Sequence, residues 1–185
     1  IRVMEIIEAS VLTKHIITEL PVVNGALEAS VAQGLAKAAV IERHGNNKGT
    51  GLGFVKGFGF HSGAVASTVA HDSHNLLIVG MNDEDMALAG NTLAECGGGM
   101  VAVRDGKVLA LLPLPIAGLM SDRPVEEVAA QVSKVEQAWR ELGCSLVSPF
   151  MTMALLSLPV LPELRLTNRG LVDTVQFRFV DLISS

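Results

Sequence analysis

Six segments of the chain either alternate apolar with polar residues or run apolar without interruption, and both patterns predict strands. They are residues 1–7, 11–20, 37–43, 76–79, 100–103 and 108–112. The block at 76–79 is wholly apolar and ends at Gly80, which is typical of a strand buried on both faces. Asp105-Gly106 suits the positive φ angles of a tight turn, so the last two segments are expected to form a hairpin.

Two segments repeat apolar residues at spacings of three and four, which predicts helices. The first has Asn82 or Asp83 as its N-cap and runs through Leu93, with acidic residues in its first turn. The second covers residues 125–142. Its apolar stripe consists of Val125, Val128, Val132, Val135, Trp139 and Leu142.

The other segments are less regular. Residues 45–53 (GNNKGTGLG) are predicted to form a loop because of their glycine content, and residues 64–70 a strand or a short helix. Residues 151–158 (MTMALLSL) suggest a short helix or a buried extended segment, and period-two alternation returns over residues 171–183. Strands and helices mix without strict βαβ order. We therefore expect one domain, residues 1–185, of the α+β class, with helices covering a mixed or mostly antiparallel sheet.

Charge and composition narrow the classes of partner. A net charge of -5 with 14 scattered Lys and Arg argues against nucleic acid and favours a small neutral substrate or another protein. No apolar run reaches the ~18 to 20 residues of a membrane helix. Cys96 and Cys144 lie outside any C-x-x-C pattern, which fits a reducing cytoplasm. With 49% hydrophobic residues we expect a covered interface and a homo-oligomer, and we interpret the chain as a piece of a longer protein.

The densest polar cluster in an apolar setting is formed by His71, Asp72, His74 and Asn75. Polar groups between buried runs must be hydrogen-bonded or bound, because an unsatisfied one costs about 1 to 3 kcal/mol. Three interpretations stay open: a turn in which Asp72 and Asn75 bond their own backbone, a strip that lines a purine pocket or supports a partner's active site, and a metal site. A metal site would need a turn, since residues 71 and 74 point to opposite faces of a strand.

Arg43 and His44 are the second candidate pair. They leave a predicted strand and enter a glycine-rich loop, where functional side chains are common. Arg43 could pair with Asp72 or with an external carboxylate, and an ordinary surface ion pair worth under ~1 kcal/mol is the alternative. The sequence has no G-x-S-x-G elbow, P-loop or H-E-x-x-H motif, so we assign no catalytic and no metal-ligating residue.

Five collinear stretches resemble the C-terminal domain of bacterial adenine deaminases. They are ERHG at 42–45, GLGFVKGFGF at 51–60, GAVASTVAHDSHNLLIVGMNDEDMALA at 63–89, LPLPIAGLMSD at 112–122 and LGCSLVSPFMTMALLSLPVLPELRLTNRGLVD at 142–173. The resemblance implies hydrolytic removal of the 6-amino group of adenine, which gives hypoxanthine and ammonia. It also implies Mn or Fe, held by His and Asp side chains of a TIM-like barrel, as the activator of water.

This chain has no His-x-His motif, so the resemblance places the metal ligands in a barrel outside it. We expect the chain alone to bind no metal and to be inactive, with the barrel of the same enzyme as its partner. The residues carried over from ERHG and AHDSHN, which we expect to line or buttress the adenine site, are Arg43, His44, His71, Asp72, His74 and Asn75. The alternatives are a stand-alone binding or assembly module and an independent metalloenzyme that uses His71, Asp72 and His74.

Overall fold

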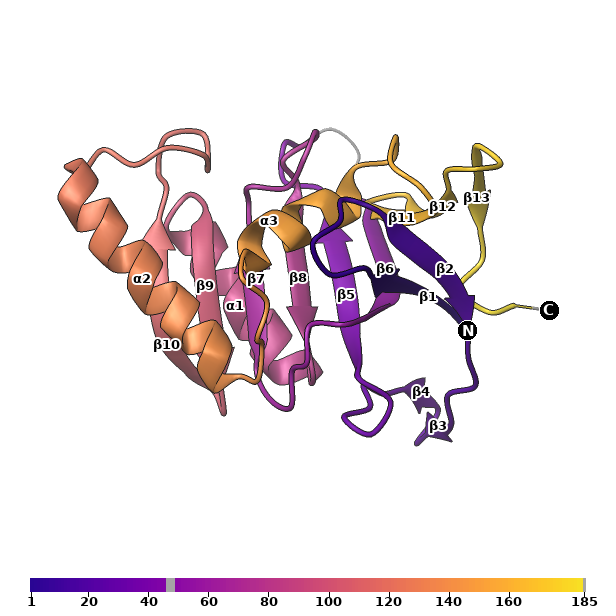
Figure 1. The fold of residues 1–185 in the computed structure, drawn as a ribbon. Helices are drawn as coiled ribbons and strands as arrows, with labels where there is room; N and C mark the ends of the chain where they lie inside the picture. The colour runs from indigo at the N-terminus through magenta and orange to yellow at the C-terminus, as the bar shows by residue number, and fades with distance from the viewer. Residues whose placement is uncertain (46–48, 185) are drawn as a thin grey trace.

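The structure is a computed structural model that describes residues 1–45 and 49–184. Its largest element is an eight-stranded sheet with the order β10-β9-β7-β8-β5-β6-β1-β2 (Figure 1). The strands are β1 (Arg2–Ile6), β2 (Thr13–Ile17), β5 (Leu35–Ile41), β6 (Thr50–Lys56), β7 (Ala64–Ser67), β8 (Leu76–Gly80), β9 (Gly99–Arg104) and β10 (Lys107–Pro113). Within this sheet only β1 and β6 pair in parallel. The sheet is mixed and mostly antiparallel, which confirms the predicted α+β class.

Helices and a smaller sheet cover this large sheet. The helices of the described residues are α1 (Asp83–Glu95), α2 (Val125–Glu141) and α3 (Pro149–Ala154), the last followed by a 3₁₀ turn at Leu155–Ser157. The smaller sheet consists of β11 (Leu164–Thr167), β12 (Gly170–Asp173) and β13 (Arg178–Val180), and β3 (Val22–Val23) pairs with β4 (Ala26–Leu27). Within the described ranges no helix has the length and apolar character needed to cross a membrane.

The central strands are buried on both faces because different elements pack on each side. On one face of the sheet, side chains such as Val65 and Leu77 form a hydrophobic core with Trp139 of α2 and with the leucines of β11 and β12. On the opposite face, side chains such as Ile78 pack against the apolar face of α1. In Figure 1, α2 and α3 lie in front of the sheet and α1 behind it. The prediction that residues 76–79 form a strand buried on both faces is thereby confirmed.

The predicted start of α1 is also confirmed, and its acidic first turn does more than cap the helix. Asn82 is the N-cap, and its Oδ1 accepts the amide proton of Asp85 at 2.7 Å. Asp85 is 2% exposed, and its carboxylate accepts the amide protons of Asp105 and Gly106 at 3.1 and 2.8 Å. One buried carboxylate therefore fixes α1 to the turn of the β9–β10 hairpin.

The apolar stripe predicted for α2 is correct except at its first member. Val135, Trp139 and Leu142 are fully buried, whereas Val125 is 74% exposed. The helix contacts β10 and β9, and its first turn extends beyond β10 at the sheet edge (Figure 1). Val125 consequently has no surface to pack on.

The predicted loop over residues 45–53 is wrong in its second half, because β6 begins at Thr50. A Cβ at Gly51 would collide with the carbonyl oxygen of Thr167, and one at Gly53 would meet the Leu171 side chain at 3.3 Å. The glycines are thus strand residues over which the small sheet packs closely. Asn46, Asn47 and Lys48 of this predicted loop lie outside the described residues.

The alternation over residues 171–183 belongs to two strands rather than one. The chain reverses between β12 and β13, and the Oδ1 of Asp173 accepts the amide protons of Val175 and Gln176 at 3.0 and 2.9 Å. A side chain that bonds backbone amides two and three residues onward stabilises a turn. Period-two alternation continues across this turn, which is why the sequence pattern did not reveal it.

Candidate functional site

The candidate residues gather at one edge of the large sheet. Residues 42–45 follow β5, residues 68–75 connect β7 to β8, and residues 114–120 follow β10. In Figure 1 these connections lie along the upper edge of the sheet. We call these three segments the loop edge. Each segment is hydrogen-bonded to another, so the fold itself holds the three segments together.

The segment AHDSHN forms a turn, but the side chain that bonds its backbone is His74 and not Asp72 or Asn75, the two residues expected from the sequence. His74 has a φ of 49°, its amide donates to the carbonyl of Ala70 at 2.7 Å, and its Nδ1 accepts the Ala70 amide proton at 3.2 Å. The His71 amide donates to Ala154 at 3.0 Å, and the Ser157 hydroxyl donates to the His71 carbonyl at 3.1 Å. The turn brings the rings of His71 and His74 to a centroid distance of 5.3 Å.

Arg43 anchors this turn and forms no ion pair with Asp72, contrary to the first possibility considered from the sequence. Its Nε donates to the carbonyl of His74 at 2.6 Å, and its Nη2 donates to the carbonyl of Ala117 at 2.7 Å. Burial lowers the pKa of Arg43. Gly118 allows the guanidinium to lie against the backbone, since a Cβ there would meet Nη1 at 2.9 Å. Arg43 therefore joins two backbone segments by hydrogen bonds and does not form a surface ion pair.

His44 also holds the turn, whereas Asn75 is the buried residue that follows it. The Nε2 of His44 lies 2.8 Å from the carbonyl of Ser73, and because a carbonyl only accepts, this nitrogen carries the proton. Asn75 is 3% exposed and lies beneath the turn, and its Oδ1 has no hydrogen-bond partner in the described part of the chain. Both residues are thus close to the turn, but Asn75 is screened from solvent.

Residues 114–120 belong to the cluster, and sequence reasoning missed this role. The Thr68 hydroxyl donates to the carbonyl of Gly118 at 2.6 Å and accepts the amide proton of Gly99 at 2.8 Å. Together with the Arg43 bond to Ala117, this fixes the loop beside the AHDSHN turn. The only signal in the sequence was the small pair Ala117-Gly118, which permits close approach of side chains from elsewhere.

Asp72 and His71 are the members of the cluster whose side chains are not used to hold it together. Asp72 is exposed, and within residues 1–45 and 49–184 neither its carboxylate nor the ring nitrogens of His71 have a hydrogen-bond or ion-pair partner. Asp72 lines a cavity of about 570 Å³ together with Ser73, Ser157 and residues of β12 and β13. The Asp72 carboxylate is therefore accessible to a ligand in this cavity or to a partner that packs on the loop edge.

These side chains do not fit a metal site. The Nδ1 of His74 already accepts a backbone proton, and the cationic guanidinium of Arg43 lies against the turn. No group of three His, Cys, Asp or Glu side chains within the described ranges could hold one ion. The loop edge instead offers two groups for hydrogen bonds to another molecule: the carboxylate of Asp72 and the imidazole of His71.

The His74 ring is expected to make the protein less stable in weak acid. Burial lowers its pKa from 6.5, and the charges of His71 and Arg43 act in the same direction. Because the folded pKa lies below the unfolded value, the contribution of His74 to stability is constant above about pH 6.5 and falls as the pH drops toward the folded pKa. Urea unfolding at about pH 7.5 and about pH 5 should show a smaller acid loss in His74→Gln than in the unmodified protein. An NMR titration that placed the His74 pKa above 6.5 would contradict this.

The fold and the loop edge define an α+β domain with a polar cluster of loops at one sheet edge, built without a metal site of its own among the described residues. A model of the adenine deaminase C-terminal domain family matches residues 10–178, and the chain therefore belongs to this family. The resemblance inferred from the sequence is confirmed.

Relatives over the whole chain agree with this assignment. The chain is 78% identical over 184 residues to an adenine deaminase of Moorella thermoacetica, covering 100% of this chain and 31% of the relative. It is 61% identical to one of Clostridium botulinum, covering 98% and 30%, and 49% identical to one of Brucella abortus, covering 97% and 31%. The chain thus spans about a third of the length of these relatives.

Proposed function

We propose that the chain is the C-terminal domain of an adenine deaminase that hydrolyses adenine to hypoxanthine and ammonia. Residues 1–185 form this domain, and the metal-binding barrel belongs to a part of the enzyme outside this chain. The support is the family match over residues 10–178 and the names of relatives that are about three times as long. Mn or Fe in that barrel would supply the activated water. The residues of this chain act around the site and do not hold the ion.

The loop edge is the surface that we propose to face the barrel. The observation that carries this is the position of Asp72, an exposed carboxylate without a partner in the described residues, on a turn that Arg43 and His44 fix in place. An unpaired carboxylate on a rigid turn loses little freedom when it accepts a hydrogen bond. Asp72 and His71 then contact or buttress residues that line the adenine site.

Replacing Asp72 by Asn in the full-length enzyme is expected to lower kcat/KM for adenine by about 10-fold to 100-fold, the usual cost of losing a supporting group. The melting temperature should change little, because the Asp72 carboxylate has no hydrogen-bond or ion-pair partner among the described residues. Ammonia release measures the activity. Asp105→Asn is the matched control, since Asp105 is an exposed carboxylate in the β9–β10 turn, at the opposite edge of the sheet from the loop edge. Unchanged kcat and KM in Asp72→Asn and His71→Gln would defeat the proposed role.

Two alternatives are separated from this proposal by direct measurements. A stand-alone binding or assembly module predicts that the native protein has the 19.5 kDa mass of this chain and no adenine turnover. An independent metalloenzyme predicts stoichiometric metal in the purified chain and ammonia release from adenine. The adenine deaminase proposal predicts a native polypeptide about three times as long.

We also propose a cytoplasmic location and assembly into a homo-oligomer. Cys96 and Cys144 are both free thiols, as is usual in a reducing compartment. Several large apolar side chains are more than half exposed, and such surface is commonly covered in an assembly. Sedimentation of the full-length protein tests the second point.

A further inference from the structure

A cavity of about 460 Å³ opens at the end of the molecule formed by β12, β13 and the C-terminal segment. It shares Arg169 and Phe179 with the cavity that Asp72 lines, but neither Asp72 nor Ser73 lines it. Its charged lining residues are three arginines and one aspartate: Arg2, Arg169, Arg178 and Asp181. The chain as a whole carries a net charge of -5, so this concentration of positive charge is a local feature. A concave surface with excess positive charge attracts anions.

Among the described residues, no carboxylate neutralises these three arginines. Within residues 1–45 and 49–184, none of their guanidinium groups lies within 4.0 Å of a carboxylate, although Asp181 lines the same cavity. By contrast, Arg104 and Arg123 each lie within 4.0 Å of a neighbouring aspartate carboxylate. The charge of the arginine cavity is therefore available to a ligand.

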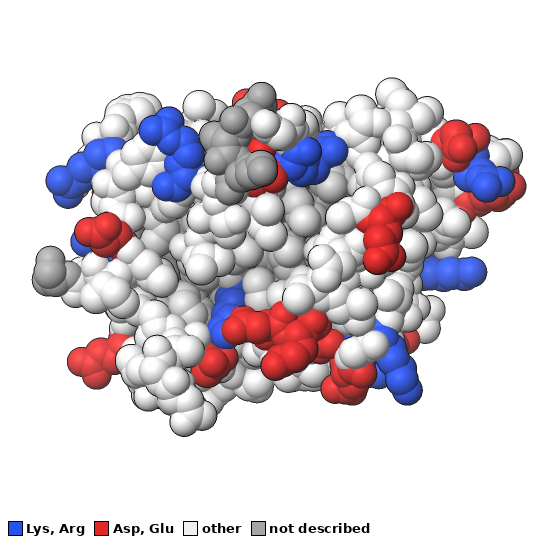
Figure 2. Space-filling model, turned by 180° about the vertical axis from the view of Figure 1, so that it is seen from behind, with Lys and Arg blue, Asp and Glu red and all other residues white. Residues whose placement is uncertain are grey.

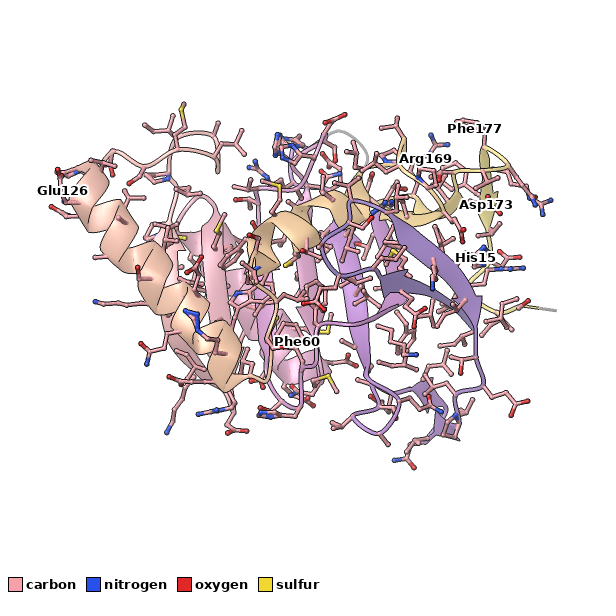
Figure 3. The ribbon with its side chains drawn as sticks, viewed as in Figure 1. His15, Phe60, Glu126, Arg169, Asp173 and Phe177 are labelled. Carbon is pink, nitrogen blue, oxygen red and sulfur yellow. The ribbon has the colours of Figure 1, made fainter. Side chains whose placement is uncertain are left out.

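Arg2 is held in position at the base of this cavity. Its Nε donates to the carbonyl of Asp181 at 3.1 Å, and its Nη1 lies 3.3 Å from the Nε2 of His15. The Nδ1 of His15 lies 3.9 Å from the carboxylate of Asp173, and Figure 3 shows His15 and Asp173 close together at this end. The contacts of Nε and Nη1 fix the orientation of the Arg2 guanidinium, and with it the direction in which Nη2 points.

Arg169 is oriented by an aromatic ring. Its guanidinium lies 4.9 Å from the centre of the Phe179 ring, and its backbone amide donates to the Thr167 hydroxyl at 3.1 Å. Stacking on a ring leaves the edge N–H groups of a guanidinium free to bind an oxyanion. Phe179 is 51% exposed and Leu52 is 62% exposed, so the same cavity also has an apolar wall.

We propose that this arginine cavity binds the phosphate group of a small phosphorylated molecule, whose organic part packs on Phe179 and Leu52. A phosphate carries up to two charges and accepts paired hydrogen bonds from several guanidinium groups, which suits three unpaired arginines better than a single carboxylate does. The cavity is concave and has the volume of a small-molecule site. This binding site is additional to the adenine chemistry proposed above.

The test is calorimetric titration of the full-length protein with inorganic phosphate, with phenyl phosphate, and with phenol as the phosphate-free match. We expect phenyl phosphate to bind with a Kd of about 1 mM or tighter, inorganic phosphate to bind more weakly, and phenol not to bind. Arg169→Gln and Arg178→Gln should each weaken binding of phenyl phosphate at least about tenfold, since each removes charge-assisted hydrogen bonds. Higher salt should weaken binding as well.

Arg140→Gln is the control variant, because it removes the same charge from the exposed face of α2, far from this cavity. Figure 2 views the molecule from the opposite side to α2, and side chains of both charges are present on that face. Absence of phosphate binding, or equal binding in Arg169→Gln, Arg178→Gln and Arg140→Gln, would overturn the proposal. Phosphate binding is measured without adenine, so its failure leaves the deaminase proposal untouched.

Discussion

Replacing Arg165 by methionine is expected to destabilise the protein by about 4 kcal/mol or more. Arg165 is 1% exposed, and burial lowers its pKa to about 10. Its guanidinium makes four hydrogen bonds of 2.7 to 2.9 Å to backbone carbonyls, those of Val11, Leu155, Leu161 and Pro162. Methionine has a similar length but no donor, so all four bonds to the charged guanidinium are lost. The carbonyls of Leu155, Leu161 and Pro162 each keep a second donor, whereas that of Val11 has none among the described residues. A hydrogen bond to a charged group contributes about 1.5 to 3 kcal/mol.

Urea unfolding measures this effect, with Trp139 as the chain's single tryptophan and hence the fluorescence reporter. Arg165→Lys keeps a positive charge but has three donors in a different geometry, so we expect a smaller loss of about 2 kcal/mol. Arg140→Met on the exposed face of α2 should change stability by less than about 0.5 kcal/mol. A loss below about 1 kcal/mol in Arg165→Met would show that the four bonds contribute little net stability.

Trp139→Ala is expected to cost about 3 to 5 kcal/mol, the range for removing a large buried aromatic side chain. Trp139 of α2 is fully buried between aromatic rings from two other segments. Its ring centre lies 5.7 Å from Phe58, 5.3 Å from Phe60 and 4.7 Å from Phe150, and Figure 3 labels Phe60 beside α2. The cluster joins α2 to α3 and to the segment after β6, so the cavity left by alanine affects three elements.

Trp139→Phe separates packing from hydrogen bonding in this cluster. The Nε1 of Trp139 has no partner in the described residues, so phenylalanine removes volume without breaking a bond. We expect a loss of about 1 to 2 kcal/mol, less than half the effect of alanine. Thermal and urea unfolding followed by circular dichroism measure both variants, because the fluorescence reporter is gone. An equal loss in the two variants would rule out packing as the main contribution.

Local signals in the sequence were sufficient for several elements. Asp105-Gly106 predicted the hairpin of β9 and β10, and both residues have positive φ angles of 52° and 71°. Asn82 was expected to cap α1, and it does. These predictions succeed because the interactions involved are between residues within a few positions of one another.

The wrong loop prediction over residues 45–53 has a tertiary origin. Gly51 and Gly53 were assigned to a loop, yet they belong to a strand because the backbone and leucines of a second sheet press against them. That sheet is formed by residues more than one hundred positions later in the chain. A glycine needed for close packing has the same sequence signature as a glycine in a loop.

By itself, the sequence determined the class of fold, the position of the polar AHDSHN segment between buried strands, and the family. Only the tertiary structure decided how each polar group is used: Arg43 donates to the carbonyls of His74 and Ala117 and leaves Asp72 free. Arg165 is buried because its acceptors include Val11, 154 residues away. The reason is that a hydrogen bond is satisfied by whichever group lies nearest in space, and that neighbour is chosen by the fold.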